Sequence, residues 1–235
     1  MDIQIQLLQK VYGKAMVVNI PMLTLKQGEL VGLVGNNGAG KTTLMRLILD
    51  LIEPTQGFVC SNGEKVNETE AWKHYTGSFI DGRFLIELYT PEEYFQFIAA
   101  VYGIDDATLH ERLAYYAPLM HDEILGKKKY IRDFSQGNKQ KIGIIGAMLI
   151  HPQVLILDEP FNFLDPSSQN LLKKLLVDYK NKYHTSVIIS SHNLQHTIDI
   201  SDRVVLMEHG EIIKNIDPIT PESTKILSEY FRSAR

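Results

Sequence analysis

The most informative segment of this chain is Gly35-Asn36-Asn37-Gly38-Ala39-Gly40-Lys41-Thr42. It matches the phosphate-binding pattern G-x-x-x-x-G-K-[ST] at every specified position. The residues before it, 29–34, form a short apolar run with β-branched residues, which predicts a buried strand. The apolar residues after it recur at helical spacing up to Pro54 and Gly57: Leu44, Leu47, Ile48, Leu51 and Ile52. Strand, glycine loop and helix together indicate a loop that binds phosphate groups.

Each part of this loop has a physical role in binding a nucleotide. Glycines let backbone N–H groups close around phosphate oxygens without a Cβ in the way. The start of the helix adds unpaired N–H groups and the positive end of its dipole. Lys41 is predicted to reach the β- and γ-phosphates, and the Thr42 hydroxyl to hold Mg²⁺. The predicted nucleotide-binding residues are Gly35, Asn36, Asn37, Gly38, Ala39, Gly40, Lys41, Thr42 and Thr43.

Composition places the chain among ordinary globular proteins. Its 235 residues can bury a full core, and 44% hydrophobic and 22% charged residues are usual values. A net charge of −4 gives no reason to expect a nucleic-acid partner. The single cysteine, Cys60, excludes an internal disulfide framework and suits a reducing cytoplasm. The longest apolar run, Ile142 to Ile150, is short of the roughly 20 residues of a membrane span, so any membrane-spanning part is expected in another chain.

Hydrophobic patterning predicts an α/β core with an insert. Ile3, Ile5 and Leu7 alternate with polar residues, which predicts a half-buried strand, and a second strand is expected at 15–18. From Pro91 to about Ile150 the spacing is helical, and residues 82–134 are interpreted as a helical insert. Alternating strands and helices then follow, which predicts a parallel sheet: strands at 154–157, 186–190 and 203–207, and helices at 167–181 and 193–200.

Two acids follow the strand predicted at 154–157. Asp158 and Glu159 come directly after four apolar residues, so both carboxylates are expected at the strand end, where parallel α/β sheets bind ligands. Asp158 is predicted to belong to the Mg²⁺ shell. Glu159 lies on the opposite side of an extended chain and is predicted to orient or deprotonate an attacking water.

The segment Phe134-Ser135-Gln136-Gly137-Asn138 resembles a signature, usually Leu-Ser-Gly-Gly-Gln, of the ATP-binding subunits of ABC transporters. The match is at Ser135 and Gly137. Phe163-Leu164-Asp165-Pro166 is similar to the family's D-loop, and Ile188-Ile189-Ser190-Ser191-His192 is similar to its switch-histidine segment. With the phosphate loop and the acid pair, these motifs occur in the family's order over nearly the whole chain.

The resemblance implies a fold. The family has a P-loop NTPase core of the RecA-like type with a mixed or parallel sheet, an N-terminal antiparallel β subdomain and a helical signature subdomain. Carried over to this chain, residues 1–235 form a single ATPase domain. Its parts are expected at 1–81 and 154–215 for the catalytic core with the β subdomain, 82–153 for the helical subdomain, and 216–235 for a C-terminal helix.

The resemblance also implies an activity and partners. The chain is expected to bind ATP and Mg²⁺ and to hydrolyse ATP, with Lys41, Glu159 and His192 as catalytic residues. Ser135, Gln136 and Gly137 are expected to contact the nucleotide of a second ATPase subunit, identical or closely related, and Asp165 to cross that interface. The other expected partner is a separately encoded polytopic membrane subunit, so the protein is expected at the cytoplasmic face of a membrane. The Ser-Gln-Gly form of the signature favours export.

Some positions depart from the family pattern or allow two interpretations. Gln136 and Asn138 replace a glycine and a glutamine of the signature. Asp81 stands where the family has its Q-loop glutamine; it is a further candidate metal ligand, and the alternative is a loop acid facing water. Tyr12 is a candidate for stacking on adenine, and a tyrosine in a surface turn is an equal alternative.

Two features of the middle region also allow two interpretations. The basic residues at 127–129 indicate a solvated face or a patch near lipid headgroups. A group of apolar residues is expected in the helical core, with a groove for a membrane subunit as the alternative for some of them: Leu85, Leu88, Tyr94, Phe95 and Phe97.

Two other functional classes compete with a transporter subunit. A soluble ABC-type ATPase that acts on ribosomes or DNA usually has two cassettes or a long coiled-coil insert, whereas this chain has one cassette and no heptads. A module that senses nucleotide without hydrolysing it would not need Glu159 and His192. The sequence therefore favours an ATP-hydrolysing transporter subunit.

Overall fold

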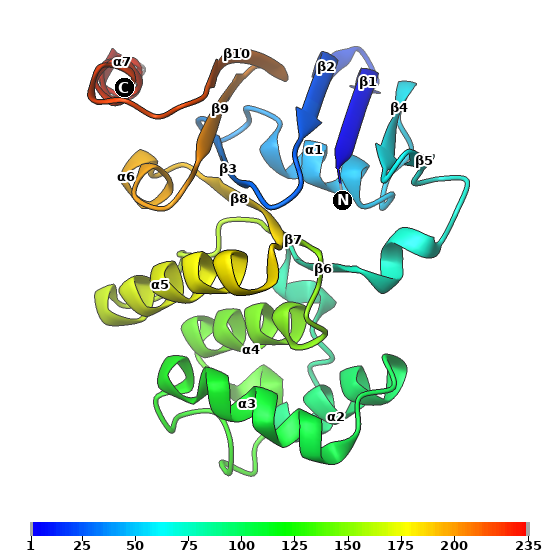
Figure 1. Cartoon of the computed structure of the whole chain (residues 1–235), viewed down its shortest axis with the longest axis vertical. Coiled ribbons are helices and arrows are strands. Elements are labelled where there is room, and N and C mark those ends of the chain that lie inside the picture. Colours follow the sequence, from blue (N-terminus) through cyan, green and yellow to red (C-terminus); the bar gives the residue numbers. More distant parts are fainter. Residues whose placement is uncertain (1, 234–235) are drawn as a thin grey trace.

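A computed structural model describes residues 2–233 and shows a mixed six-stranded sheet with the strand order β10-β9-β3-β8-β7-β6 (Figure 1). Strands β6, β7, β8, β3 and β9 run parallel, and β10 pairs antiparallel with β9. Their bounds are Leu30–Val34 for β3, Thr76–Phe79 for β6, Val154–Leu157 for β7, Ser186–Ser191 for β8, Arg203–Glu208 for β9 and Glu211–Ile216 for β10. The predicted α/β class is confirmed.

A second, antiparallel sheet has the strand order β2-β1-β4-β5. Its strands are β1 (Ile3–Tyr12), β2 (Ala15–Leu25), β4 (Gln56–Ser61) and β5 (Glu64–Lys65). Helix α1 (Lys41–Ile48) packs between the two sheets in a shared apolar core. The prediction that Leu7 continues the buried alternation is wrong: its φ of 48° marks an irregularity in β1, so Leu8 is buried and Leu7 is 63% exposed.

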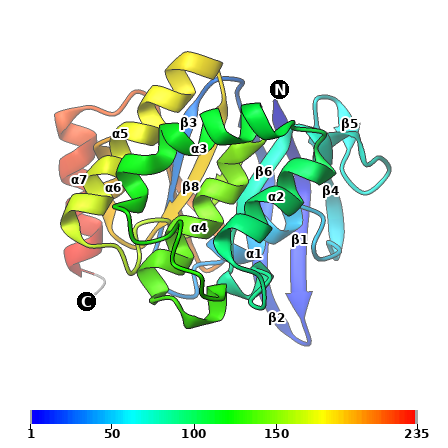
Figure 2. The same cartoon turned by 90° about the horizontal axis from the view of Figure 1, so that it is seen from below.

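Helices cover the opposite face of the large sheet in a second core (Figure 2). They are α2 (Pro91–Val101), α3 (Asp106–Met120), α4 (Gln136–Leu149) and α5 (Pro166–Tyr183). Residues Lys141 to Leu149 of α4 are buried without interruption. This is possible because α4 lies very close to its neighbours: a Cβ on Gly143 would lie 2.1 Å from the Phe79 ring. Close packing of this kind holds α4 against the sheet.

Short helices complete the fold: η1 (Ala71–His74), η2 (Gly82–Phe84), η3 (Ile131–Asp133) and α6 (Leu194–Ile198). Helix α7 (Pro221–Ser233) follows β10 and buries Leu227 against a small apolar cluster. Residues 234 and 235 of the predicted C-terminal helix lie outside the described residues, and the subdomain boundaries stay a prediction. In the described part of the chain, no helix combines the length and apolarity needed to cross a membrane.

The helical core contains some of the apolar residues predicted for it. Leu85 and Phe95 are buried, and Tyr94 packs against the same cluster. Leu88 and Phe97, however, are 62% and 45% exposed. Phe97 follows Phe95 by two positions, so it points to the other side of α2, and Leu88 precedes the helix. The prediction of a core position is wrong for these two residues.

A histidine lies among aromatic rings just after the C-terminal end of α4. The His151 ring centroid is 4.6 Å from that of Tyr183 and 5.9 Å from that of Tyr179. Burial, followed by the nearby charges of Arg112 and Lys182, lowers the pKa of His151 to about 4. The folded protein therefore holds this ring neutral at a pH where an exposed histidine would be half protonated.

We expect this histidine to make stability depend on pH. Because the pKa of His151 is depressed in the folded state, the stability of the neutral form is complete above about pH 6.5 and is lost as the pH falls towards 4. His151→Asn, which tolerates the φ of 52° at this position, should flatten that part of the pH profile. Urea midpoints between pH 7 and 5 measure it, with the exposed His184→Asn, at a φ of 54°, as the matched control. Equal pH slopes in the two variants would contradict the expectation.

Candidate functional site

The glycine loop lies between β3 and α1, and its own lysine hydrogen-bonds to its backbone. Lys41 is 5% exposed, and its Nζ donates hydrogen bonds to the carbonyl oxygens of Gly35 at 2.6 Å and Asn36 at 3.2 Å. Burial lowers the pKa of Lys41, and the carboxylates of Glu159 and Asp158 oppose that shift. The loop is therefore closed around a buried cation.

Only glycine fits at the junction of the loop with α1. Gly40 precedes the helix with a φ of 99°, and a Cβ there would lie 2.5 Å from the carbonyl oxygen of Val17. Gly38 has a φ of 83° and faces open space. The backbone can therefore turn its N–H groups towards a ligand at this point.

A cavity of about 330 Å³ lies over this loop. It brings together most of the predicted nucleotide-binding residues with two of the predicted catalytic residues, Lys41 and Glu159. The lining residues are Val17, Asn37, Gly38, Ala39, Gly40, Lys41, Thr42, Thr43 and Glu159. Sequence reasoning missed Val17, which reaches the cavity from β2. Tyr12 is not among these lining residues: it is 50% exposed, with Lys10 Nζ 5.0 Å from its ring centroid.

Oxygen atoms converge beside the loop at the end of β7. The Thr42 hydroxyl donates to Asp158 Oδ2 at 2.5 Å, and the Ser190 hydroxyl donates to Asp158 Oδ1. Hydroxyl and carboxylate oxygens are the hard ligands that Mg²⁺ prefers, and this ion commonly takes one or two protein ligands beside phosphate and water. Among the described residues there is no group of three His, Cys, Asp or Glu that could hold a metal. The donor set therefore fits Mg²⁺ delivered with a phosphate ligand.

Glu159 is surrounded by the groups that could orient its carboxylate. His192 Nδ1 lies 2.9 Å from Glu159 Oε2, and Lys41 Nζ lies 3.8 Å from Oε1. The Glu159 N–H donates to the Ser190 hydroxyl at 2.8 Å. Ser190 was not among the predicted site residues, although it lies two positions before His192 in the switch-histidine segment. It connects the two acids from the neighbouring strand β8.

The signature segment lies at the start of α4, on the surface. Ser135 caps the helix, and its Oγ accepts a hydrogen bond from the Asn138 N–H at 3.2 Å. Ser135 and Gln136 are exposed, and neither lines the cavity of the same chain. A Cβ on Gly137 would lie 2.6 Å from the carbonyl oxygen of Phe163, so a glycine is needed here for packing. The start of α4 is thus presented outward.

Asp165 caps helix α5. Its carboxylate accepts hydrogen bonds from the Ser168 N–H at 3.0 Å and the Ser168 hydroxyl at 2.6 Å, at the start of α5. The hydroxyl and the backbone N–H of Ser168 lower the pKa of Asp165 to about 2. The residue remains exposed and ionised, as a contact across an interface would require.

Asp81 contacts two arginines. Arg83 Nη2 and Nε donate to Asp81 Oδ2 at 2.5 and 2.9 Å, and Arg46 Nη2 of α1 lies 3.6 Å from the same oxygen. The hydrogen bonds from Arg83 are the main cause that lowers the pKa of Asp81. The interpretation as a loop acid that faces water is therefore wrong, because this side chain is 20% exposed and ion-paired. These contacts turn the carboxylate to arginines, and a metal-ligand role stays a prediction.

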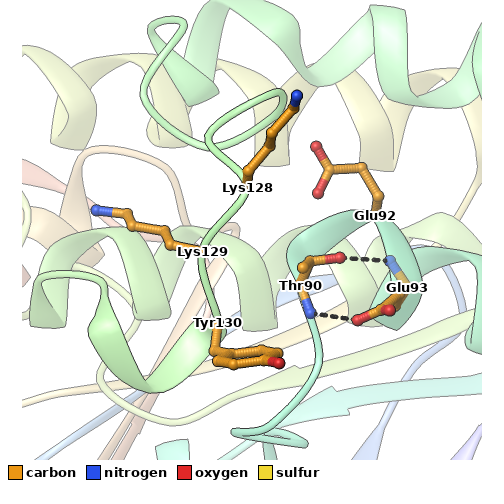
Figure 3. A pocket seen from close by; sticks show the side chains of 6 residues that line it. All are labelled: Thr90, Glu92, Glu93, Lys128, Lys129 and Tyr130. Atoms are coloured by element: carbon orange, nitrogen blue, oxygen red, sulfur yellow. Dashed lines mark hydrogen bonds between the residues drawn. The ribbon is translucent and has the colours of Figure 1, made fainter.

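A second cavity, of about 440 Å³, lies beside the basic residues at 127–129 (Figure 3). It is lined by Thr90, Glu92, Glu93, Lys128, Lys129 and Tyr130. Thr90 and Glu93 form a reciprocal capping box at the start of α2. Figure 3 shows the two lysine side chains pointing in different directions. They do not converge on one point of the cavity, and the two interpretations of this basic segment, a solvated face or a patch near lipid headgroups, stay predictions.

Comparison with known proteins shows what kind of cassette this is. A family model described as ABC transporter matches residues 18–162. The chain belongs to the ABC transporter family. The bacitracin transport ATP-binding protein BcrA of Bacillus licheniformis is 33% identical over 211 residues, covering 89% of this chain and 67% of BcrA. The lantibiotic transport ATP-binding protein SrtF of Streptococcus pyogenes is 30% identical, covering 90% and 89%.

A solved structure supports the same assignment. The structure titled as the ATP binding subunit of an ABC transporter superposes with a TM-score of 0.83 at 28% identity, covering 92% of this chain and 90% of that one. Three predictions from the sequence are confirmed: the chain is an ATP-binding subunit of the ABC transporter family, it has the P-loop fold, and it belongs to a class of ATPases. The roles of individual residues in this cassette remain proposals.

Proposed function

We propose that this cassette binds ATP with Mg²⁺, hydrolyses it in an ATP-dependent dimer, and powers transport through a separate membrane subunit. The observation that carries the proposal is the cavity in which Lys41, Thr42 and Glu159 converge. Asp158 is hydrogen-bonded to Thr42 there, and His192 contacts Glu159. Export is the proposed direction, in keeping with the Ser-Gln-Gly signature and with a relative that acts in bacitracin transport. The proposed location is the cytoplasmic face of a membrane.

The residues at the cavity would have different roles in phosphoryl transfer to water. Such a reaction needs positioning and charge neutralisation more than covalent help. Lys41 would bind the β- and γ-phosphates. Thr42 and Asp158 would hold Mg²⁺, which neutralises charge on the phosphate oxygens when it is bound.

The attacking water would be handled by Glu159. Its carboxylate would orient the water and accept its proton. His192 would keep that carboxylate in place through the 2.9 Å contact of its Nδ1, so that its other ring nitrogen can face the γ-phosphate. The 49% exposure of the His192 side chain leaves room for that contact.

The second half of the site would come from another subunit. Ser135, Gln136 and Gly137 stand at the start of α4, where unpaired N–H groups and the helix dipole favour an anion. Two exposed residues there, Ser135 and Gln136, lie outside the cavity of their own chain. Pairing two copies head to tail would place them against the partner's γ-phosphate, with Asp165 at the interface.

A surface for the membrane subunit is proposed near α2. Several large apolar side chains in or next to α2 are exposed, where a surface in contact with water usually has polar residues. They are Phe84, Leu88, Phe97, Val101 and Tyr102. Phe97 and Val101 are four positions apart and so share one face of α2. We call Phe97 and Val101 the apolar face and propose that it receives a segment of the membrane subunit.

Co-purification tests this part of the proposal. The double variant Phe97→Glu and Val101→Glu should lose the membrane subunit when both genes are co-expressed, because charges at these positions oppose burial of the face. Met22→Glu, at a residue 74% exposed on β2, is the control and should retain it. Equal recovery with both variants would reject the apolar face. Recovery of ribosomes or nucleic acid in place of a membrane protein would support the competing class of soluble ATPases.

A further inference from the structure

The backbone of Glu159 has an unusual conformation that its neighbours hold in place. Its φ is 47°, in the left-handed region that a residue with a Cβ rarely adopts. Such a conformation persists where surrounding contacts determine it. The Glu159 N–H donates to the Ser190 hydroxyl at 2.8 Å, and its carbonyl accepts from the Asn162 N–H at 3.1 Å and from Gln140 Nε2 at 3.2 Å. Both polar groups of this residue's backbone are therefore held by partners.

One of these partners comes from the signature helix. Gln140 is the fifth residue of α4, one turn after Gln136. The same helix touches the acid loop a second time, because Gly137 packs against the carbonyl of Phe163, another residue with a positive φ, 64°. The first turns of α4 therefore contact both ends of the loop 159–163, through Gln140 at Glu159 and through Gly137 at Phe163.

We propose that Gln140 is a positioning residue that connects the signature helix to the backbone of Glu159. Through this hydrogen bond, the position of α4 sets the direction of the Glu159 carboxylate in the same chain. A small change of the backbone at Glu159 moves Oε1 and Oε2 relative to Lys41 and His192, which now lie 3.8 and 2.9 Å away. The inference rests on the proposed function of Glu159 and of the start of α4.

A consequence follows for the two sites of a dimer. The start of α4 is proposed to contact the partner's nucleotide, whereas Gln140 contacts the acid that acts on the nucleotide of its own chain. Binding of ATP in one site would then adjust the catalytic carboxylate of the other. Coupling of this kind between two sites gives cooperative dependence on ATP.

The test uses variants that keep the size of Gln140 and change its donor. Gln140→Met removes the N–H group at similar length, and Gln140→Lys restores a donor. A neutral hydrogen bond of this length predicts that kcat of Gln140→Met falls roughly threefold to tenfold, with KM for ATP unchanged within about twofold. The Hill coefficient for ATP should fall towards one, and Gln140→Lys should recover at least about half of the lost kcat.

Controls separate positioning from a structural effect. Gln96→Met, at an exposed position of α2, should keep kcat and cooperativity. When Gln140→Met is added to Glu159→Gln, dimer formation with ATP should persist, which shows that folding and binding are intact. If Gln140→Met does not fold, the kcat of Gln140→Lys, which has a donor, is compared with the kcat of Gln140→Glu, which has only acceptors.

Two results would overturn the inference: an unchanged kcat in Gln140→Met, or equal impairment in the Met and Lys variants. The proposed function fails separately, because its failure is retained turnover in Glu159→Gln. An inactive Glu159→Gln together with a fully active Gln140→Met rejects the role of Gln140 alone.

Discussion

Glu159→Gln should reduce the turnover of ATP by on the order of 10²- to 10⁴-fold while ATP still binds. Glutamine has the shape of glutamate and can still accept the hydrogen bond from His192, but it cannot take a proton from water. The glycine loop, Lys41 and Thr42 are unchanged in this variant, so the contacts proposed for the phosphates remain. A bound but unhydrolysed nucleotide should therefore accumulate, and with it the dimer.

Steady-state hydrolysis and gel filtration with ATP measure the two parts of this result. Glu64→Gln, at an exposed position of β5, carries the same chemical change outside the cavity and should behave as the wild type. Turnover within tenfold of the wild type in Glu159→Gln would remove Glu159 as the group that activates water. Loss of ATP binding in that variant would instead indicate that the carboxylate supports the phosphate cradle.

Much of the fold could be predicted because its signals are local. The buried strand, the glycine loop and the helix around Lys41 follow one another in sequence, and the four apolar residues before Asp158 lead directly into the acid pair. The structure has these elements close to where the sequence predicts them. The expectation that Leu51 and Ile52 continue the helix is wrong, because α1 ends at Ile48 and Leu51 is 49% exposed. Strand β10 was not predicted, because Glu211–Ile216 has no clear alternation and only one of its faces touches the core.

The positions that sequence reasoning missed depend on contacts between distant segments. Val17 lines the cavity from β2, and Ser190 reaches both acids from β8. The residues next to Val17 do not indicate its contact, and the only local sign for Ser190 is its place in the switch-histidine segment, two positions before His192. Asp81 illustrates the opposite case: the sequence offers a metal or water, and the partners in the structure are Arg83 two residues away and Arg46 on α1. The ion-pair partners of this carboxylate determine what it can bind, and the hydrophobic periodicity of the sequence does not indicate those partners.

Lys41→Met should abolish most of the stabilisation that ATP gives to the protein. Charge-assisted hydrogen bonds to phosphate are worth enough that their loss predicts roughly 10- to 100-fold weaker ATP binding. At an ATP concentration about 100 times the wild-type Kd, stabilisation should fall from about 2.7 kcal/mol to about 0.4–1.4 kcal/mol. Thermal unfolding with and without ATP measures this difference. Lys174→Met, exposed on α5, is the matched control.

The same variant should not destabilise the protein without ATP. The pKa of Lys41 is lowered by burial, so the folded state binds this proton less tightly than the unfolded state does. The cost of the buried charge is present at neutral pH and is relieved as the pH rises through the folded pKa towards 10.5. Methionine removes that cost and loses two hydrogen bonds to carbonyls at the cavity.

The two effects oppose each other, so the Tm of the nucleotide-free variant at pH 7 should be no lower than that of the wild type by more than about 2 °C. A large drop in Tm would mean that Lys41 mainly holds the loop together. An unchanged Tm with a lost response to ATP would mean that the chain keeps a buried cation at a cost to its own stability, and that a phosphate group offsets the cost when it binds.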